Sequence, residues 1–269
     1  MTNSIAISKE DKDMLYQYIG IGWPDAKMII LGNEPGLASR DLSFTLDKIR
    51  KISHSGSGLA WGGGVFSDVR MAYTINEAYA NPTTSEFARF ITRLSLAIEH
   101  KDERFLGELS IAGKAKINDY IYRPLRERNV ALLNLRPLPR PTEDTWIYKG
   151  IDKKEYNKEW NFRLKRHQMT DRGKERMWGI RDFTRWETRN NLDNIVIGVG
   201  DKENKKAFYE KVFHYEDDFE FHKANLDSHS IYFNLKHKII LSDYFNSRNG
   251  IKLRGLRELY NFLLSRKLI

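Results

Sequence analysis

The sequence predicts an α/β protein, a three-layer α/β/α sandwich around a central, mostly parallel sheet of four to five strands. Two observations lead to this prediction. Short, continuous apolar runs rich in Ile and Val recur along the chain, and such runs are typical of parallel strands that are covered on both faces. Stretches with helical periodicity lie between the runs, and strand–helix alternation indicates helices packed against a sheet.

Four apolar runs are predicted to be core strands, and a weaker run adds a fifth. They are residues 27–31 (KMIIL), 130–135 (VALLNL), 195–199 (IVIGV) and 238–241 (KIIL), with 231–233 as the weaker one. In folds of this class, ligands bind at the carboxyl ends of the parallel strands. The residues that directly follow each strand are therefore the first candidates for a functional site.

Three helices are predicted from apolar residues at helical spacing. They cover residues 85–99, 203–213 and 251–266. A fourth helix is expected from about residue 170 onward.

We expect a single domain over residues 1–269 with a basic, Trp-rich insertion at about 146–190. Residues 146–186 hold 12 Lys and Arg against 6 Asp and Glu, and four of the six tryptophans. One interpretation is a solvated helical excursion whose tryptophans pack on the core. The other is a surface that faces nucleic acid, with cations on phosphates and aromatic rings on bases.

Composition excludes several classes of site. The chain has no cysteine, which rules out disulfides, thiolate nucleophiles and Cys-bound iron–sulfur or zinc sites. Its histidines show no ligand-like spacing, so we expect neither a metal nor another cofactor. The formal net charge of +9 favours a polyanionic partner, although a basic surface can also serve solubility alone.

The chain is expected to be cytoplasmic and associated with DNA rather than with a membrane. Its first 18 residues are polar and charged, unlike a signal peptide with its apolar stretch. No apolar run approaches the roughly 20 residues that cross a bilayer. We expect a monomer.

Polar segments follow three of the predicted strands. The first strand runs into Gly32-Asn33-Glu34-Pro35-Gly36, and the second ends in Asn134-Leu135-Arg136-Pro137. The last strand is followed by Ser242-Asp243-Tyr244-Phe245-Asn246 and then by Arg248. A buried Asn at a strand end needs a hydrogen-bond partner, and its amide can read the edge of a base.

In this order and at these positions, the three segments resemble motifs of the uracil-DNA glycosylase superfamily. The first resembles its Gly-x-x-Pro motif, whose variable positions carry a catalytic carboxylate or Asn. The second resembles the strand-terminal Asn that reads the flipped base, and residues 194–200 resemble its third core strand. The resemblance runs from about residue 27 to the end and leaves 146–186 unaccounted for.

The departures from the family pattern concern the substrate. The last motif usually holds His-Pro-Ser or Asn-Pro-Ser, and this chain has Asp243 and Tyr244 there. No His stands at the uracil-stabilising position, and Gly36 replaces the Tyr that shields the C5 edge of the pyrimidine. Without cysteine, the chain also lacks the iron–sulfur cluster of the thermostable branch.

The resemblance, together with residue type and charge, predicts a role for each candidate residue. The expected catalytic residues are Glu34, Asn33 and Asp243. Glu34 is expected to stabilise the sugar cation and orient water, with Asn33 as the other candidate for positioning water. From its residue type, Asp243 is expected to accept a hydrogen bond from a cytosine-type amino group. The expected substrate-binding residues are Gly32, Pro35, Gly36, Trp61, Phe66, Asn134, Arg136, Tyr244 and Asn246. The expected DNA-binding residues are Arg248, Lys252, Arg163, Lys165 and Arg166.

The resemblance therefore implies a hydrolase, a monofunctional DNA glycosylase that flips out a modified or damaged pyrimidine and leaves an abasic site. The departures favour a hypermodified cytosine, such as glucosylated hydroxymethylcytosine in phage DNA. A repair enzyme for uracil or another deaminated base is the close alternative. A second alternative is a catalytically inactive nucleic-acid-binding module with the same fold. A third and weaker alternative is an enzyme that acts on free nucleotides, because the net charge favours a polyanion and no phosphate-binding glycine fingerprint is present.

Overall fold

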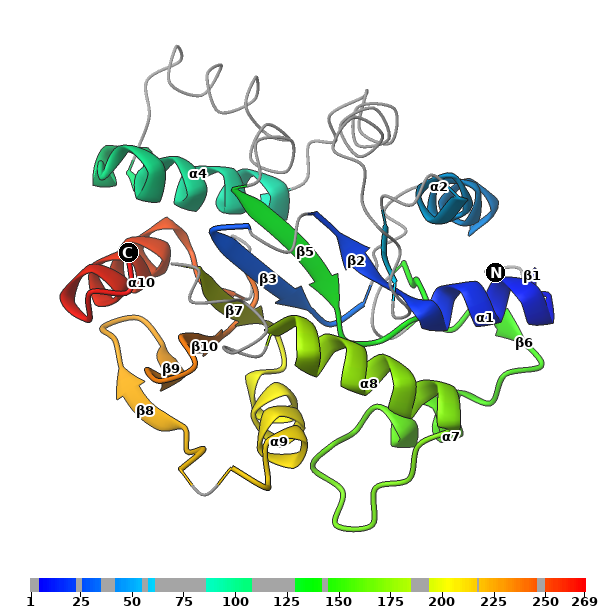
Figure 1. Cartoon of the computed structure of the whole chain (residues 1–269). Helices are drawn as coiled ribbons and strands as arrows, with labels where there is room; N and C mark the ends of the chain where they lie inside the picture. The colour runs from blue at the N-terminus through cyan, green and yellow to red at the C-terminus, as the bar shows by residue number, and fades with distance from the viewer. Residues whose placement is uncertain are drawn as a thin grey trace.

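The computed structural model describes residues 5–22, 26–34, 42–54, 58–60, 86–107, 129–141, 145–184, 194–216, 218–245 and 250–269. Within these ranges the protein is mixed α/β, as predicted, with helices on both sides of one large sheet (Figure 1).

Eight strands of the described residues form a mixed sheet in the order β4-β2-β5-β3-β7-β10-β9-β8. Its middle four strands, β5 (Val130–Asn134), β3 (Met28–Gly32), β7 (Ile195–Val199) and β10 (Ile239–Ser242), pair in parallel. On one side, β2 (Tyr18–Ile21) pairs antiparallel with β5 and β4 (Gly58–Ala60) with β2. On the other, β9 (Ser230–Asn234) and β8 (His222–Asn225) extend the sheet antiparallel.

The sheet is therefore larger and more mixed than the predicted four to five mostly parallel strands. All five predicted runs form strands, but four of the seven strand pairings in the described sheet are antiparallel. The additional strands give little signal in the sequence, because β4 is three residues long and β8 is the polar segment HKAN. A strand this short or this polar shows no hydrophobic periodicity.

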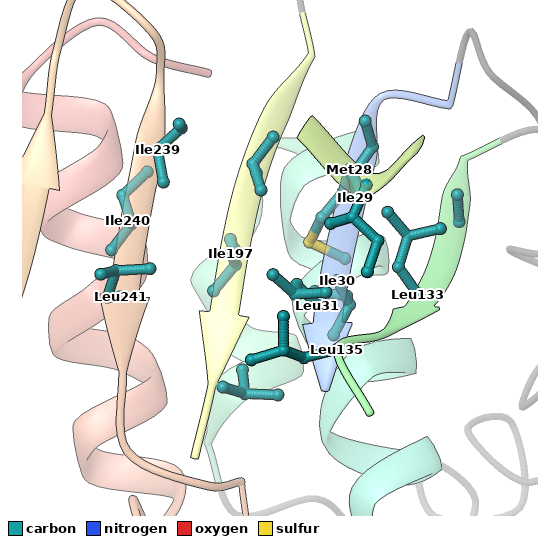
Figure 2. Packing of buried hydrophobic residues seen from close by; sticks show 14 of the residues in the cluster. Met28, Ile29, Ile30, Leu31, Leu133, Leu135, Ile197, Ile239, Ile240 and Leu241 are labelled. Atoms are coloured by element: carbon teal, nitrogen blue, oxygen red, sulfur yellow. The ribbon is translucent and has the colours of Figure 1, made fainter. Parts of the chain in front are cut away.

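The middle strands are apolar because both of their faces are covered. Met28, Ile29, Ile30 and Leu31 of β3 are all buried, and Ile30 lies between Leu132 of β5 and Ile197 of β7. Figure 2 shows their side chains interleaved with those of the neighbouring strands. Burial of this kind, at about 25 cal/mol per Å² of apolar surface, fixes the position of the strand ends that carry the candidate site.

Helices cover the two faces of the sheet. Figure 1 shows α4 (Glu86–His100) and α10 (Leu253–Ser265) on one face, and α8 (Asp171–Thr184) and α9 (Lys202–Val212) on the other. The predicted helices are confirmed to within two residues at each end. The remaining described elements are α1 (Lys9–Gln17), α2 (Leu42–His54), α7 (Lys153–Glu159), the 3-10 turn Glu103–Leu106, and a small parallel pair of β1 (Ile5–Ala6) with β6 (Tyr148–Lys149).

The Trp-rich insertion is part of the covering layer rather than a detached excursion. Trp160 is fully buried, and Trp146 and Trp178 pack partly buried against the core. The described tryptophans therefore support the interpretation of a packed helical segment, whereas Trp186 lies outside the described residues. The predicted helix from about residue 170 is α8, which packs on α1 and β2.

Candidate functional site

The carboxyl ends of β5, β3, β7 and β10 lie at one edge of the sheet, because these strands run parallel (Figure 1). Polar and aromatic side chains follow each strand there. We call this set the edge cluster. It consists of Asn33, Glu34, Asn134, Arg136, Arg140, Asp201, Lys202, Lys205, Asp243 and Tyr244.

Glu34 forms a buried ion pair with Arg140. One oxygen, Oε2, accepts hydrogen bonds from Arg140 Nε at 2.9 Å and from Nη2 at 2.6 Å, and Arg136 Nη1 lies 3.9 Å away. The side chains of Glu34 and Arg140 are 8% and 1% exposed. An unpaired carboxylate at this depth would be strongly unfavourable, so Arg140 is what permits a negative charge at the end of β3.

Two tyrosines hold the segment that carries Arg140. The Tyr148 hydroxyl donates to the Pro139 carbonyl at 2.6 Å, and the Leu138 N–H donates to the Tyr156 hydroxyl at 3.2 Å. Burial is the main cause that raises the pKa of both hydroxyls above the ordinary value, and the Glu34 carboxylate adds to it. Both tyrosines therefore stay neutral hydrogen-bonding groups at physiological pH.

Asn33 is bound by a lysine of α9, the helix that follows β7, whereas Glu34 is bound by an arginine that follows β5. Its Oδ1 accepts a hydrogen bond from Lys205 Nζ, and its backbone carbonyl accepts from the Arg136 N–H at 2.6 Å. Two of the three candidate catalytic residues, Asn33 and Glu34, are thus each bound to a different cation.

Asn134 is the last residue of β5 and lies opposite Gly32 in the parallel pairing. A Cβ added at Gly32 would stand 3.5 Å from Asn134 Oδ1, so the two predicted substrate-binding residues are neighbours. The backbone carbonyl of Asn134 accepts a hydrogen bond from Arg176 of α8, which fixes the main chain where the side chain leaves it.

Arg136 lies between two carboxylates without a close hydrogen bond to either. Its Nη1 and Nη2 are 3.9 Å from Glu34 Oε2 and 3.7 Å from Asp201 Oδ2. Its Nε is buried, with no hydrogen-bond partner among the described residues. The charge of this guanidinium is therefore compensated by two carboxylates, while its Nε donor is not used.

Asp243 is paired with Lys202 rather than standing alone at the end of β10. Lys202 Nζ donates to Asp243 Oδ2 at 3.0 Å, and also to the carbonyl and the hydroxyl oxygen of Ser230 at 2.8 and 3.1 Å. The Asp243 side chain is 42% exposed, so it can accept a further hydrogen bond from a ligand.

Tyr244 presents an aromatic ring next to these polar groups. It is 40% exposed and stacks on Phe87 of α4, with ring centroids 5.1 Å apart and planes at 9°. The ring also lies against Gly200 at the end of β7. A partly exposed ring that is backed by a second ring is suited to stacking on a flat heterocycle.

None of the predicted DNA-binding residues of the insertion takes part in the ion pairs given above for the edge cluster. Arg163, Lys165 and Arg166 are exposed in the connection between α7 and α8. This connection packs on α9, where Asn204 bonds both Trp160 and Phe162. Lys252 is exposed directly before α10.

Six predicted site residues lie outside the described residues. They are Pro35, Gly36, Trp61, Phe66, Asn246 and Arg248.

Sequence reasoning missed several members of the edge cluster. Asp201, Lys202 and Lys205 follow β7 directly or within its next helix, and the motif comparison assigns no role to that strand end. The rule that ligands bind after each parallel strand, applied to β7, would have found Asp201 and Lys202. Arg140 gave no separate signal, because its partner Glu34 is 106 positions away in sequence.

Comparison with family models, curated proteins and solved structures finds no match for this chain. Within the described ranges, no helix has the length and apolar character needed to span a membrane. The same ranges contain no group of three or more His, Asp or Glu residues arranged to hold a metal ion.

Proposed function

We propose that this chain is a DNA glycosylase of the uracil-DNA glycosylase superfamily, with a central parallel sheet in a three-layer fold and a monomeric state. It would hydrolyse the N-glycosidic bond of a modified or damaged pyrimidine and leave an abasic site. One observation carries the proposal. The three motif segments, far apart in sequence, bring Asn33, Glu34, Asn134 and Asp243 to the same sheet edge.

The chemistry of the edge cluster suits this reaction. When the bond between C1′ and the base nitrogen breaks, its electron pair leaves with the base, and positive charge develops on the sugar. The Glu34 carboxylate, fixed by Arg140, would stabilise that charge without moving. Water then adds to C1′, and the proton that it gives up neutralises the departing base anion. Because Glu34 is bound to a guanidinium, we assign it an electrostatic role rather than that of a general base.

Binding of the flipped base would use the other members. Tyr244 would stack on the ring, Asn134 would read an edge of the base, and Asp243 would accept from an exocyclic amino group. An acceptor at Asp243 favours cytosine derivatives over uracil, which supports a hypermodified cytosine of phage DNA as substrate and a defence role. Uracil or another deaminated base, removed in repair, is the alternative.

The basic residues would hold the DNA. Arg163, Lys165, Arg166 and Lys252 are exposed, as phosphate-binding side chains must be.

A second candidate is a nucleic-acid-binding module that has the fold without the reaction. The observation that favours it is that both candidate acids are already engaged by cations, Glu34 by Arg140 and Asp243 by Lys202. Such a module would bind DNA with strong salt dependence and release no base.

A product assay separates the two. The protein is incubated with phage DNA and with duplexes carrying uracil, hypoxanthine, hydroxymethylcytosine or glucosylated hydroxymethylcytosine. Released bases are identified by mass, and abasic sites by alkaline cleavage. Release of one base, strongly slowed in Asn33→Ala and Glu34→Ala, supports the glycosylase. Tight binding without release from any of these DNAs contradicts it and favours the binding module.

A further inference from the structure

Lys205 is a buried lysine that the proposed reaction has so far not used. It lies in α9 and its side chain is fully buried. A lysine ammonium is strongly hydrated in water, and burying it is unfavourable unless its donors are satisfied. An apolar residue of similar length would be the simpler choice for such a position. The role of Lys205 is therefore to be found in what its ammonium contacts.

The fold leaves room for this side chain over β7. A Cβ added at Gly198 would stand 2.9 Å from Lys205 Cδ, so the lysine stem crosses the strand where no side chain projects. The Gly200 carbonyl accepts a hydrogen bond from Lys205 Nζ at 2.5 Å, and Gly200 has a φ of +72°, which glycine adopts without strain. Two glycines, one in β7 and one directly after it, thus direct the ammonium to the sheet edge.

The ammonium is directed at Asn33. Lysine only donates hydrogen bonds, so the Asn33 atom bound to it must be the carbonyl oxygen, Oδ1. The amide nitrogen Nδ2 is then turned the other way. It lies 3.2 Å from where a Cβ on Gly200 would stand, and Tyr244 Cδ2 lies 3.3 Å from the same point. The amide nitrogen of Asn33 and the edge of the Tyr244 ring, which is proposed to stack on the base, therefore both lie next to Gly200.

We propose that Lys205 is a positioning residue that holds Asn33 as a hydrogen-bond donor toward the departing base. This inference rests on the proposed glycosylase function. As the glycosidic bond breaks, the electron pair that goes to the base nitrogen spreads to the carbonyl oxygen of the pyrimidine, and a donor at that oxygen stabilises it. The ammonium on Oδ1 polarises the amide and strengthens its N–H groups as donors. Asn33 then assists the leaving group, in place of the water-orienting role inferred from the sequence.

The kinetic test combines three variants with a matched control. Lys205→Met keeps the length of the side chain and removes the donor, and Lys205→Gln keeps a neutral donor. Lys206→Met changes the next lysine of α9, which pairs with Glu210 at 2.5 Å. Single-turnover base release is expected to fall about 10²-fold in Lys205→Met, as for a misplaced catalytic group. It should fall less in Lys205→Gln and stay unchanged in Lys206→Met, with the affinity for DNA unaltered throughout.

A double variant distinguishes positioning from a structural role. If Lys205 acts through Asn33, then Lys205→Met combined with Asn33→Ala releases base no more slowly than Asn33→Ala alone. If the double variant instead loses the product of the two single-variant rate losses, the two residues act independently and the inference is overturned. Full release by a folded Lys205→Met protein also overturns it. Absence of release by the wild-type protein contradicts the proposed function instead.

A spectroscopic measurement keeps the inference testable without activity. The side-chain NH₂ signals of Asn33 are assigned in a ¹⁵N-correlated spectrum by their loss in Asn33→Asp. They should shift and broaden in Lys205→Met and remain in place in Lys206→Met. Unchanged Asn33 signals in a folded Lys205→Met protein overturn the inference.

Discussion

At the scale of single residues, Glu34 and Arg140 link the stability of the protein to its proposed chemistry. Glu34→Gln keeps an oxygen for Arg140 but removes the charge, and it leaves a buried cation without compensation. We expect base release to fall about 10²–10³-fold and the free energy of unfolding to fall by up to about 3–5 kcal/mol. Denaturant unfolding and single-turnover release measure the two effects.

The double variant Glu34→Gln with Arg140→Met separates these effects. It removes both charges, so stability should return in large part while base release stays low. An active and fully stable Glu34→Gln protein contradicts the assigned role of Glu34.

The pH dependence of stability has an identifiable source in His167. Lys211 Nζ lies 2.8 Å from His167 Nδ1, and His167 Nε2 lies 2.6 Å from the Glu159 carbonyl. Because lysine only donates, Nδ1 must accept, which fixes the neutral tautomer with its proton on Nε2. Burial is the main cause that lowers the pKa of His167 below its ordinary value of 6.5.

As the pH falls below about 6.5, the His167 ring therefore binds its second proton in the unfolded chain before it does so in the folded protein. We expect the free energy of unfolding to decrease from pH 7 to pH 5, and His167→Gln to reduce that decrease. The exposed neighbour Gln168 provides the control, because Gln168→Ala changes no titrating group. Equal pH slopes for the wild-type and His167→Gln proteins contradict this account.

At the scale of elements, Arg176 fastens α8 to the strand ends that carry the site. Its guanidinium donates to the carbonyls of Tyr18 at 2.5 Å and Leu135 at 3.0 Å. Further acceptors are the carbonyls of Leu15, Tyr16, Asn134 and Arg136. Burial lowers the pKa of Arg176 to about 10, which still leaves it charged at neutral pH. One side chain thus joins α1, β2 and the segment after β5.

Arg176→Met should lower the free energy of unfolding by about 3 kcal/mol or more, because several buried carbonyls lose their donor. Arg176→Lys should recover little of this free energy, since one ammonium cannot reach all of the carbonyls that the planar guanidinium contacts. Lys174→Met on the exposed face of α8 should change stability by less than about 0.5 kcal/mol. A small effect of Arg176→Met in denaturant unfolding contradicts the bracing role.

The same elements show how far the sequence allowed prediction. The middle strands were predictable because continuous apolar runs have one common explanation, burial on both faces. The strands β4 and β8 were not, because β4 has three residues and β8 is polar. The strand β2 was missed although its segment YIGI is apolar, because it continues directly from α1 with no turn signal between them. In the site, Asn33, Glu34 and Asn134 follow predicted strands directly. The contacts of Arg140 with Glu34, of Arg176 with Leu135 and of Lys205 with Asn33 span 106, 41 and 172 positions of sequence. No local pattern encodes contacts of this kind.

At the scale of the whole molecule, the net charge of +9 predicts salt-dependent binding to DNA. Replacing Arg163, Lys165 and Arg166 by Gln should weaken binding to any duplex and flatten the dependence of log K on log salt by about one unit per lost phosphate contact. A salt titration of binding measures the slope. Replacing the exposed Lys236, which pairs with Asp218, is the control. An unchanged slope in the triple variant would place the DNA on another surface.

If the edge cluster stabilises a sugar cation, as we propose, the protein should distinguish abasic analogues by their charge, which can be measured without knowing the base. One duplex carries a pyrrolidine, which is cationic at the sugar position, and the other a neutral tetrahydrofuran. We predict that the wild-type protein binds the pyrrolidine duplex at least about 10²-fold more tightly, as transition-state analogues are bound, and that Glu34→Gln loses this preference. Equal affinity of the wild-type protein for the two duplexes would contradict the claim and favour a binding module.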